Sequence, residues 1–187
     1  MAETDRVRWD RRYANPDALK RKDGPDALLV RHTPPAGPGA RALELACGLG
    51  HNAIWLAEQG YTVDALDISL TALRLARETM LARGVRGVHF VAADLDHFPL
   101  PERQYDVVCV FRFLDRALFP ALRERVRSGG VIVYQTLNTG HLEKHPDTRP
   151  DHMLRRGELP QQFPGWTVLE AADLEHISLF AARKPPA

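Results

Sequence analysis

Two glycines and a following acid form the part of this sequence that is best suited to chemistry. Gly48 and Gly50 come directly after an apolar stretch at 42–46, and a helical pattern of apolar residues begins immediately behind them. Glycine allows a sharp turn and a close approach of a ligand to the main chain, and the start of a helix presents unpaired N–H groups. Asp67 ends a second apolar stretch, 17 residues after Gly50. If the two stretches are neighbouring parallel strands, this carboxylate lies beside the turn, where it would bind ribose hydroxyls. The pattern therefore predicts a site for an adenosine-containing cofactor.

Two cofactors fit this pattern. The spacing Gly48-x-Gly50-x-x-Ala53 satisfies the loose dinucleotide fingerprint, and Asp67 lies near the expected ribose acid, so NAD is one candidate. Glu44 favours the other candidate, because it is an acid within the first apolar stretch, four residues before Gly48. A fixed negative charge disfavours a pyrophosphate and attracts a cofactor that carries an ammonium and a sulfonium. S-adenosylmethionine carries both, and it is the cofactor we expect; the alternative interpretation of Glu44 is a partly solvated acid at a strand end.

The same order of features resembles the class I S-adenosylmethionine-dependent methyltransferases, over most of the chain from about Trp9 to Lys184. In that family the glycine turn holds the methionine part of the cofactor, the acid ending the second strand holds the ribose, and an acid after the third strand meets the adenine. Ala46 stands where the family usually has its first glycine, and alanine is small enough to keep the close approach. The cofactor-binding residues that the resemblance implies are Glu44, Ala46, Cys47, Gly48, Gly50, Asn52, Asp67, Ile68, Asp94, Leu95 and Phe111.

Within that family, the stretch 50–67 is most similar to the small tellurite-resistance methyltransferases. The stretches 112–120, 128–130 and 154–159 also have counterparts in that group. Its tellurite-acting members carry extra residues in a C-terminal hairpin, including a His-Arg pair implicated in handling the oxyanion. Here the hairpin is short, and His176-Ile177 stands at that place. The resemblance implies a small-molecule methyl acceptor, with chalcogen oxyanions and thiols among the candidates.

Arg112 is the candidate catalytic residue. A methyl group on a sulfonium is already electrophilic, so holding donor and acceptor in line is the main task, and a dedicated base is optional. Arg112 follows the fourth expected strand, where the resemblance places the transferred methyl, and its guanidinium would orient an anionic acceptor. The alternative interpretation is a structural ion pair with Asp115 or Asp106.

Further candidates for contact with cofactor or acceptor lie in two other segments. Trp9 and Tyr13, at positions i and i+4 of a helical stretch, are expected to fold over the cofactor as a lid or to pack an amphipathic arm onto the core. Arg149 and Arg155 belong to a segment of the length that often covers a substrate.

Apolar stretches and helical patterns alternate along the rest of the chain. Ser69 is the expected N-cap of a helix that ends near Arg83, another helix is expected over 116–127, and a turn is expected at Gly129-Gly130. Alternation of this kind predicts a parallel sheet with right-handed crossovers and helices on both faces. We predict an α/β fold, a Rossmann-like, doubly wound and mostly parallel seven-stranded sheet with an antiparallel last strand. The expected strands are 42–46, 61–66, 88–92, 105–111, 131–135, 167–171 and 176–182.

Length and charge limit the classes of protein. A chain of 187 residues suits one domain, 1–187, with a helical arm or lid over 1–35 and a cofactor-binding core over 40–184; it is short for a two-domain dehydrogenase. The net charge of +1 gives no reason to expect a nucleic-acid partner. The apolar runs are too short to span a membrane, and the first residues lack a basic region followed by an apolar core. We therefore expect a cytoplasmic protein without a membrane partner; its oligomeric state is left open.

Cysteines and histidines give no metal-binding pattern. Cys47 and Cys109 fall in or beside expected buried strands, where free, packed thiols are the expectation. His141, His145 and His152 share one segment, but prolines and a glycine interrupt any helix that would hold them at fixed spacing, so no metal is expected.

The function we predict is S-adenosylmethionine-dependent methyl transfer to a small molecule. Two alternatives stay open: an NAD-binding Rossmann protein, and a methyltransferase-like module that binds the cofactor without turnover.

Overall fold

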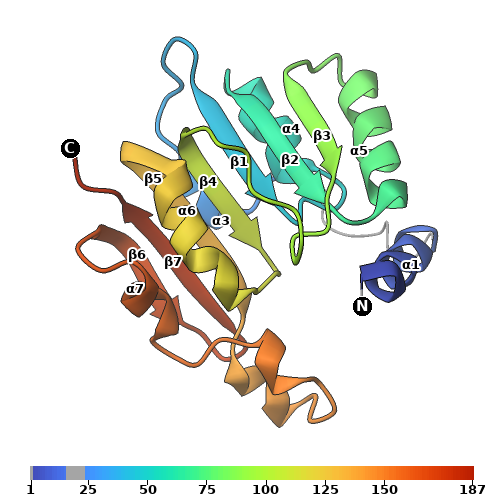
Figure 1. Ribbon diagram of the computed structural model, residues 1–187, viewed down its shortest axis with the longest axis vertical. Helices are drawn as coiled ribbons and strands as arrows, with labels where there is room; N and C mark the ends of the chain where they lie inside the picture. Colours follow the sequence, from blue (N-terminus) through green and yellow to red (C-terminus); the bar gives the residue numbers. More distant parts are fainter. Residues whose placement is uncertain (1, 16–23) are drawn as a thin grey trace. The chain divides into compact units, whose positions relative to one another are not determined.

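The computed structural model describes residues 2–15 and 24–187 (Figure 1). The chain folds into two compact units. The first consists of the described residues of 1–27 together with 34–101, and the second consists of 28–33 together with 102–187. Both units contain strands connected by helices, as expected for an α/β protein. The assignment of 1–187 to a single domain stays a prediction.

Three parallel strands form the sheet of the first unit. They are β1 (Arg41–Leu45), β2 (Thr62–Asp67) and β3 (Val88–Ala92), with β2 in the middle. The side chains of β1 and β2 are almost all buried, so the apolar stretches seen in the sequence are core strands. Two helices, α4 (His51–Glu58) and α5 (Leu70–Ala82), connect the strands and pack on them. Because the strands are parallel, their carboxyl ends meet at one edge of this sheet, and the glycine turn and Asp67 both lie there.

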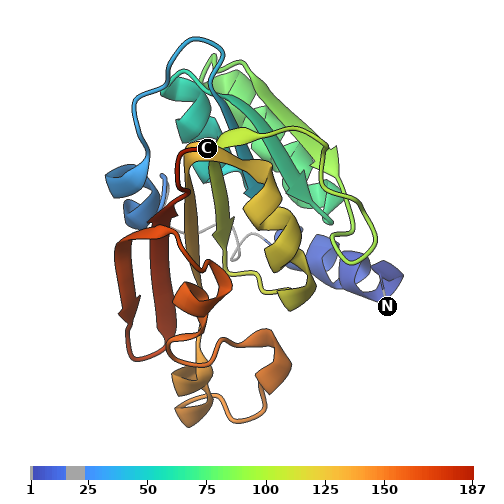
Figure 2. The ribbon, with the colours of Figure 1, turned by 60° about the vertical axis from the view of Figure 1, so that its left-hand side comes forward.

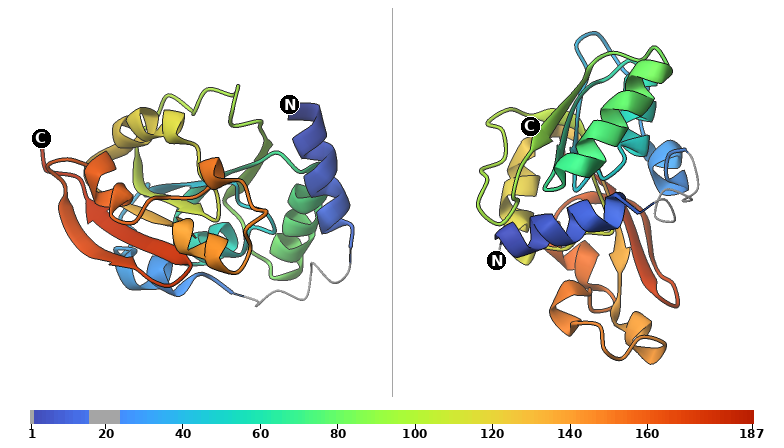
Figure 3. Two further views of the ribbon diagram at one scale, coloured as in Figure 1. Left: turned by 90° about the horizontal axis from the view of Figure 1, so that it is seen from below. Right: turned by 90° about the vertical axis from the view of Figure 1, so that its right-hand side faces the viewer.

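Helices of the first unit begin where the sequence predicts. Ser69 is the N-cap of α5, and its hydroxyl oxygen accepts a hydrogen bond from the Ala72 N–H at 3.1 Å. The helix ends at Ala82, one residue before the predicted end, and Arg83 is its C-cap. The N-terminal helix α1 (Ala2–Tyr13) packs against α5, and Figure 3 shows it lying across the beginning of that helix.

Four strands form the sheet of the second unit. Their order is β4 (Tyr105–Phe111), β5 (Val126–Leu137), β7 (Ile177–Arg183) and β6 (Thr167–Asp173). β4 and β5 are parallel, and β7 runs antiparallel to both of its neighbours. The remaining elements are three helices, α3 (Ala27–His32), α6 (Phe119–Arg125) and α7 (Glu158–Gln162), and three short 3₁₀ helices, η1 (Arg116–Leu118), η2 (Thr139–Glu143) and η3 (Pro150–His152).

Two expectations for this unit are wrong. The helix predicted over 116–127 is η1 followed by α6, which ends at Arg125, and the turn predicted at Gly129-Gly130 lies within β5. Val126 is fully buried and pairs with Tyr105, so its side chain is better placed in the sheet than at a helix end. Gly129 has φ +73°, and a Cβ on Gly130 would lie 3.0 Å from a backbone oxygen of the neighbouring strand. The two glycines therefore permit a bulge, which appears as a register shift between β4 and β5.

Along the whole chain the strand order is β3-β2-β1-β4-β5-β7-β6. This order, with its antiparallel last strand, confirms the predicted fold class. Both cysteines are buried thiols outside any disulfide bond, as expected. Among the described residues, no helix has the length and apolar character needed to cross a membrane. The cellular compartment stays a prediction.

Candidate functional site

The turn after β1 is formed by residues in the left-handed region of backbone space. φ is +52° at Ala46, +53° at Gly48 and +68° at Gly50. A left-handed conformation costs an alanine about 1 kcal/mol, so the fold imposes this conformation on Ala46. The glycines are also short of space: a Cβ on Gly48 would lie 2.6 Å from the Tyr13 hydroxyl oxygen, and one on Gly50 would lie 2.9 Å from the Phe90 ring. Both backbone angle and space therefore favour glycine at these two positions.

Asp67 is tied to this turn by two backbone hydrogen bonds. The Gly48 N–H donates to Asp67 Oδ2 at 2.7 Å, and the Ser69 N–H donates to Oδ1 at 2.8 Å. The residue is 6% exposed. Burial raises the pKa of Asp67 above its ordinary value, and the nearby charge of Asp10 adds to this, although the N–H groups of Ser69, Gly48 and Ile68 act in the opposite direction. The carboxylate is thus fixed in orientation at the end of β2 and has lone pairs left for further donors.

Glu44 lies inside the core of the first unit, where a carboxylate is costly. Asn52 donates from Nδ2 to Glu44 Oε1 at 2.9 Å, and the Asn52 side-chain oxygen accepts from the Asp26 N–H at 2.8 Å. Within the described part of the chain, Glu44 Oε2 is buried and has no hydrogen-bond partner of good geometry. Burial raises the pKa of Glu44 to about 8, against the opposing effects of Asn52 and the Ala53 N–H and with a contribution from the Asp67 charge. Among the residues that the structure describes, Glu44 is therefore a buried acid without a cationic partner. The alternative of a partly solvated strand-end acid is wrong because the residue is only 2% exposed.

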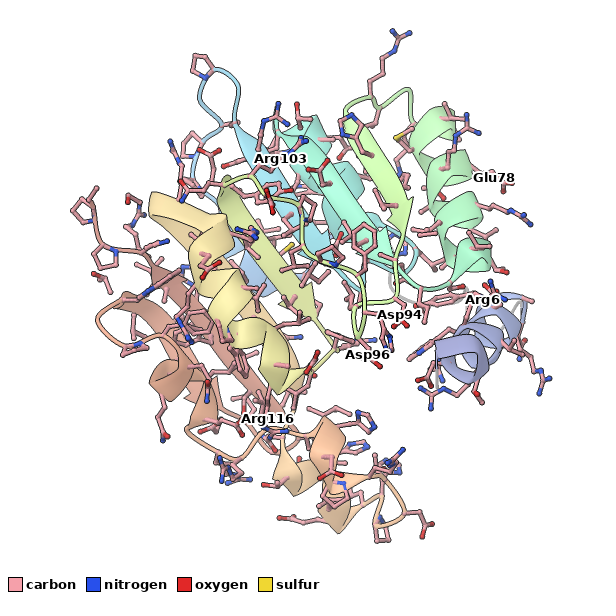
Figure 4. All side chains as sticks on the ribbon, viewed as in Figure 1. Arg6, Glu78, Asp94, Asp96, Arg103 and Arg116 are labelled. Atoms are coloured by element: carbon pink, nitrogen blue, oxygen red, sulfur yellow. The ribbon has the colours of Figure 1, made fainter. Side chains whose placement is uncertain are left out.

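Asp94 and Leu95 follow β3 at the same edge of the sheet. The Ala93 N–H donates to the Asp67 backbone oxygen at 2.9 Å, which brings the start of this loop beside the end of β2. Asp94 is half-buried and Leu95 is buried. The Asp94 carboxylate accepts a long hydrogen bond of 3.2 Å from the Asp96 N–H and lies 2.8 Å from His97 Nδ1 (Figure 4). Asp94 thus has a local role in its own turn as well as its predicted role toward adenine, which stays a prediction.

Trp9 and Tyr13 lie on α1, in the first unit. Their rings stack with centroids 6.0 Å apart, and Tyr13 is 8% exposed. The hydroxyl of Tyr13 reaches the glycine turn, as its distance to the Gly48 Cβ position shows. Asp10, which the sequence analysis did not identify, accepts hydrogen bonds at the beginning of α5. The sequence offered one signal for Asp10: it lies three residues before Tyr13, and residues i and i+3 share one face of a helix.

Phe111 and Arg112 belong to the second unit. Phe111 is the last residue of β4, and the Arg112 N–H donates to the Gln135 backbone oxygen at 2.7 Å. Arg112 has φ +58°, an uncommon value for a residue with a side chain. The two acids considered as its structural partners have other roles: Asp106 pairs with Arg127 at 2.6 Å, and Asp115 caps η1. An exposed arginine held in a left-handed conformation at a strand end is an observation that fits a functional role, which stays a prediction.

Arg149 and Arg155 lie between β5 and α7, in a segment that Figure 2 shows extending beyond the end of β5. Both side chains are exposed. The organising residue of this segment is Arg116, which the sequence analysis missed. Arg116 donates to both oxygens of Glu158, at 2.6 and 2.9 Å, and to the backbone oxygens of residues 151 and 153, at 2.8 Å each (Figure 4). The Arg155 N–H donates to the same carboxylate at 2.8 Å.

The carboxylate of Glu158 is ionised at neutral pH in this arrangement. Burial alone would raise its pKa, but the hydrogen bonds from Arg116 and the Arg155 N–H, with their charges, hold the pKa below its ordinary value. The pair therefore fixes one conformation of the segment at its base, and the exposed Arg155 side chain also lies 3.6 Å from Glu158 Oε2.

The predicted site residues thus fall into two groups. The first unit contains the glycine turn with its neighbours at the carboxyl ends of β1 and β2, and also Trp9 and Tyr13 on α1, whose role as a lid stays a prediction. The second unit carries Phe111, Arg112, Arg149 and Arg155, and the roles predicted for them stay predictions. Among the described residues, no group of three or more His, Cys, Asp or Glu side chains is arranged to hold a metal ion.

Comparison with known proteins shows which protein family this chain matches. Residues 42–130 match a family described as "Methyltransferase domain". Malonyl-[acyl-carrier protein] O-methyltransferase of Enterobacter lignolyticus is 34% identical over 131 residues, which cover 67% of this chain and 49% of the relative. The chain spans about half the length of the curated relatives it matches.

Two solved structures share the fold. The N-methyltransferase NodS of Bradyrhizobium japonicum, determined with S-adenosyl-L-homocysteine, has a TM-score of 0.76 at 17% identity and covers 96% of this chain and 98% of its own. TehB of Haemophilus influenzae has a TM-score of 0.66 at 19% identity and covers 78% of this chain and 58% of its own.

Proposed function

Because the chain carries a methyltransferase domain of the S-adenosylmethionine-dependent kind, we propose that it transfers a methyl group from this cofactor to a small-molecule acceptor. When bound, the cofactor supplies an electrophilic methyl group on a sulfonium. The protein's own residues bind and orient the two reactants and exclude water.

Glu44 is the observation that carries this proposal. Its Oε2 is buried without a hydrogen-bond partner among the described residues, although buried carboxylates are normally paired. A ligand with positive charge near the glycine turn would supply the missing partner and would favour the ionised carboxylate. S-adenosylmethionine has that charge, whereas the pyrophosphate of NAD would be repelled.

Asp67 and the glycine turn supply the rest of the fit. Asp67 is held at the end of β2 by two N–H groups and has free lone pairs for ribose hydroxyls. Gly48 and Gly50 are buried beneath Tyr13 and Phe90, and the absence of a Cβ lets these side chains pack directly on the main chain of the turn. The residues of the first unit that would hold the cofactor are Glu44, Ala46, Cys47, Gly48, Gly50, Asn52, Asp67, Ile68, Asp94 and Leu95. Phe111, at the end of β4 in the second unit, is a further candidate from the sequence.

The acceptor is the finer part of the proposal. Resemblance to the tellurite-resistance group supports a chalcogen oxyanion or a thiol, and the relative of Enterobacter lignolyticus is a malonyl-[acyl-carrier protein] O-methyltransferase. Among these candidates an oxyanion, or a thiol that loses its proton, carries negative charge, and permanently charged guanidinium groups suit such an acceptor. We assign the orienting role to Arg112, with Arg149 and Arg155 as further contacts.

The proposal is tested in two steps. Calorimetric titration with S-adenosylmethionine, S-adenosylhomocysteine and NAD comes first, and binding of NAD without binding of the other two would contradict the cofactor assignment. The second step follows transfer of labelled methyl groups to pools of thiols, chalcogen oxyanions and small carboxylic acids. Tight cofactor binding without transfer to any of these pools would favour a binding module without turnover.

A further inference from the structure

We propose that Asp10 is a positioning residue of the cofactor site: it fastens α1 across the beginning of α5 and thereby holds Tyr13 over the glycine turn. This inference rests on the proposed function, because it gives α1 the task of retaining a bound cofactor. We call the contact of Asp10 with α5 the latch.

The latch consists of two short hydrogen bonds to one carboxylate oxygen. Asp10 Oδ1 accepts from the Ser69 hydroxyl at 2.7 Å and from the Thr71 N–H at 2.9 Å. The first N–H groups of a helix have no partner within the helix, and a carboxylate there also interacts favourably with the helix dipole. Ser69 already accepts from the Ala72 N–H, so a residue 61 positions away in the sequence completes the cap of α5.

Tyr13 lies three residues after Asp10, on the same face of α1. It is 8% exposed, and its hydroxyl oxygen would be 2.6 Å from a Cβ on Gly48. Gly48 in turn donates its N–H to Asp67. The latch therefore connects α1 to the two features that the proposed cofactor site depends on, the glycine turn and the acid at the end of β2.

The position of the latch also explains an electrostatic feature of the site. Ser69 is a shared neighbour, since its hydroxyl donates to Asp10 and its N–H donates to Asp67. The charge of Asp10 consequently contributes to the raised pKa of Asp67. Two carboxylates that share Ser69 as a neighbour are a favourable environment for ligand hydroxyl donors, and a fastened α1 would hinder the departure of a ligand that contacts Tyr13.

The first experiment measures the latch without any cofactor. Hydrogen exchange of backbone amides is compared for wild type, Asp10→Ala and the control Asp5→Asn. The control removes the charge of another acid on α1, Asp5, which pairs with the exposed Arg8. We expect at least tenfold faster exchange in α1 and at Thr71 for Asp10→Ala only. Equal protection in Asp10→Ala and wild type would overturn the latch, whatever the protein binds.

The second experiment measures its effect on the cofactor. Release of tritiated S-adenosylmethionine is followed by rapid dilution and filtration for the same proteins and for Tyr13→Ala with and without Asp10→Ala. We expect about tenfold faster release for Asp10→Ala, a change of less than twofold for Asp5→Asn, and little added effect of Asp10→Ala once Tyr13 is absent.

The outcomes separate the two proposals. Unchanged release in Asp10→Ala, or a full effect in the Tyr13→Ala background, would overturn the role of the latch in holding Tyr13. A wild-type protein that binds no S-adenosylmethionine would overturn both this role and the proposed function, while the exchange measurement would still decide whether Asp10 fastens α1.

Discussion

Replacement of Glu44 by glutamine should stabilise the free protein at alkaline pH and weaken cofactor binding at the same time. A carboxyl group whose pKa is higher in the folded than in the unfolded chain contributes stability below the unfolded pKa, and this contribution is lost as the pH rises through the folded pKa. For Glu44 that window extends from about pH 4.5 to about pH 8. Glutamine has no charge to bury, so the variant should lack this loss.

The size of the effect follows from the burial of Glu44. The pKa of Glu44 rises from 4.5 in the unfolded chain to about 8 in the folded chain. At about 1.4 kcal/mol for each pH unit, wild type therefore loses roughly 5 kcal/mol of its free energy of unfolding between these two pH values. The glutamine oxygen can still accept from Asn52, but its amide N–H groups would be short of acceptors, which costs about 1–3 kcal/mol. The net gain in the free energy of unfolding should therefore be roughly 2–4 kcal/mol at pH 8.5.

Urea unfolding at pH 5.5, 7 and 8.5 measures this gain, with Glu58→Gln on the exposed end of α4 as the control. Calorimetry in buffers of different ionisation enthalpy gives the second measurement. Wild type should release a proton when it binds S-adenosylmethionine at pH 7, because a bound cation lowers the pKa of Glu44, and the variant should release none and bind at least tenfold more weakly. Parallel pH profiles of wild type and Glu44→Gln, or equal affinities, would refute the reasoning.

Four further predictions concern individual contacts. Asp67→Ala should weaken cofactor binding by about 2 kcal/mol in calorimetric titration and, because two backbone N–H groups lose their acceptor, should also lower the free energy of unfolding by about 1–3 kcal/mol; an unchanged dissociation constant would exclude Asp67 from the site. Gly48→Ala should be destabilising in urea unfolding by more than the roughly 1 kcal/mol due to its positive φ, and Tyr13→Phe should restore part of the difference; strictly additive effects would mean that the hydroxyl does not limit the space there. Arg116→Met should lower the free energy of unfolding by about 2–4 kcal/mol, since it leaves a buried carboxylate and two carbonyl groups without their donor, and a loss below 1 kcal/mol would contradict the structural role. Arg112→Met should raise the KM of the acceptor or lower kcat while the cofactor dissociation constant stays within about twofold, and loss of cofactor binding in a folded variant would assign the arginine to the cofactor instead.

Local patterns in the sequence were sufficient for much of the fold. The strands β3 and β4 have the predicted bounds, Ser69 caps α5, and the antiparallel last strand is where the sequence indicated it. These features depend on periodicity, capping residues and glycines, which act over a few neighbouring positions. The early end of α6 and the glycines within β5 were missed, because pairing of Val126 with a distant strand outweighed the local helical pattern.

The candidate site divides in the same way. Spacing alone identified the glycine turn, Asp67 and the acid at Glu44, because parallel strands bring their carboxyl ends to one edge. Only the tertiary structure decided that Glu44 is buried with a raised pKa and with an oxygen that has no hydrogen-bond partner in residues 2–15 and 24–187, since these properties depend on what surrounds the carboxylate. Asp10 and Arg116 likewise acquired their importance from partners 61 and 42 positions away, and no local pattern in a single sequence marks such contacts. The sequence thus determined which residues could bind a cofactor. Folding determined the charge, the burial and the hydrogen-bond partners of those residues.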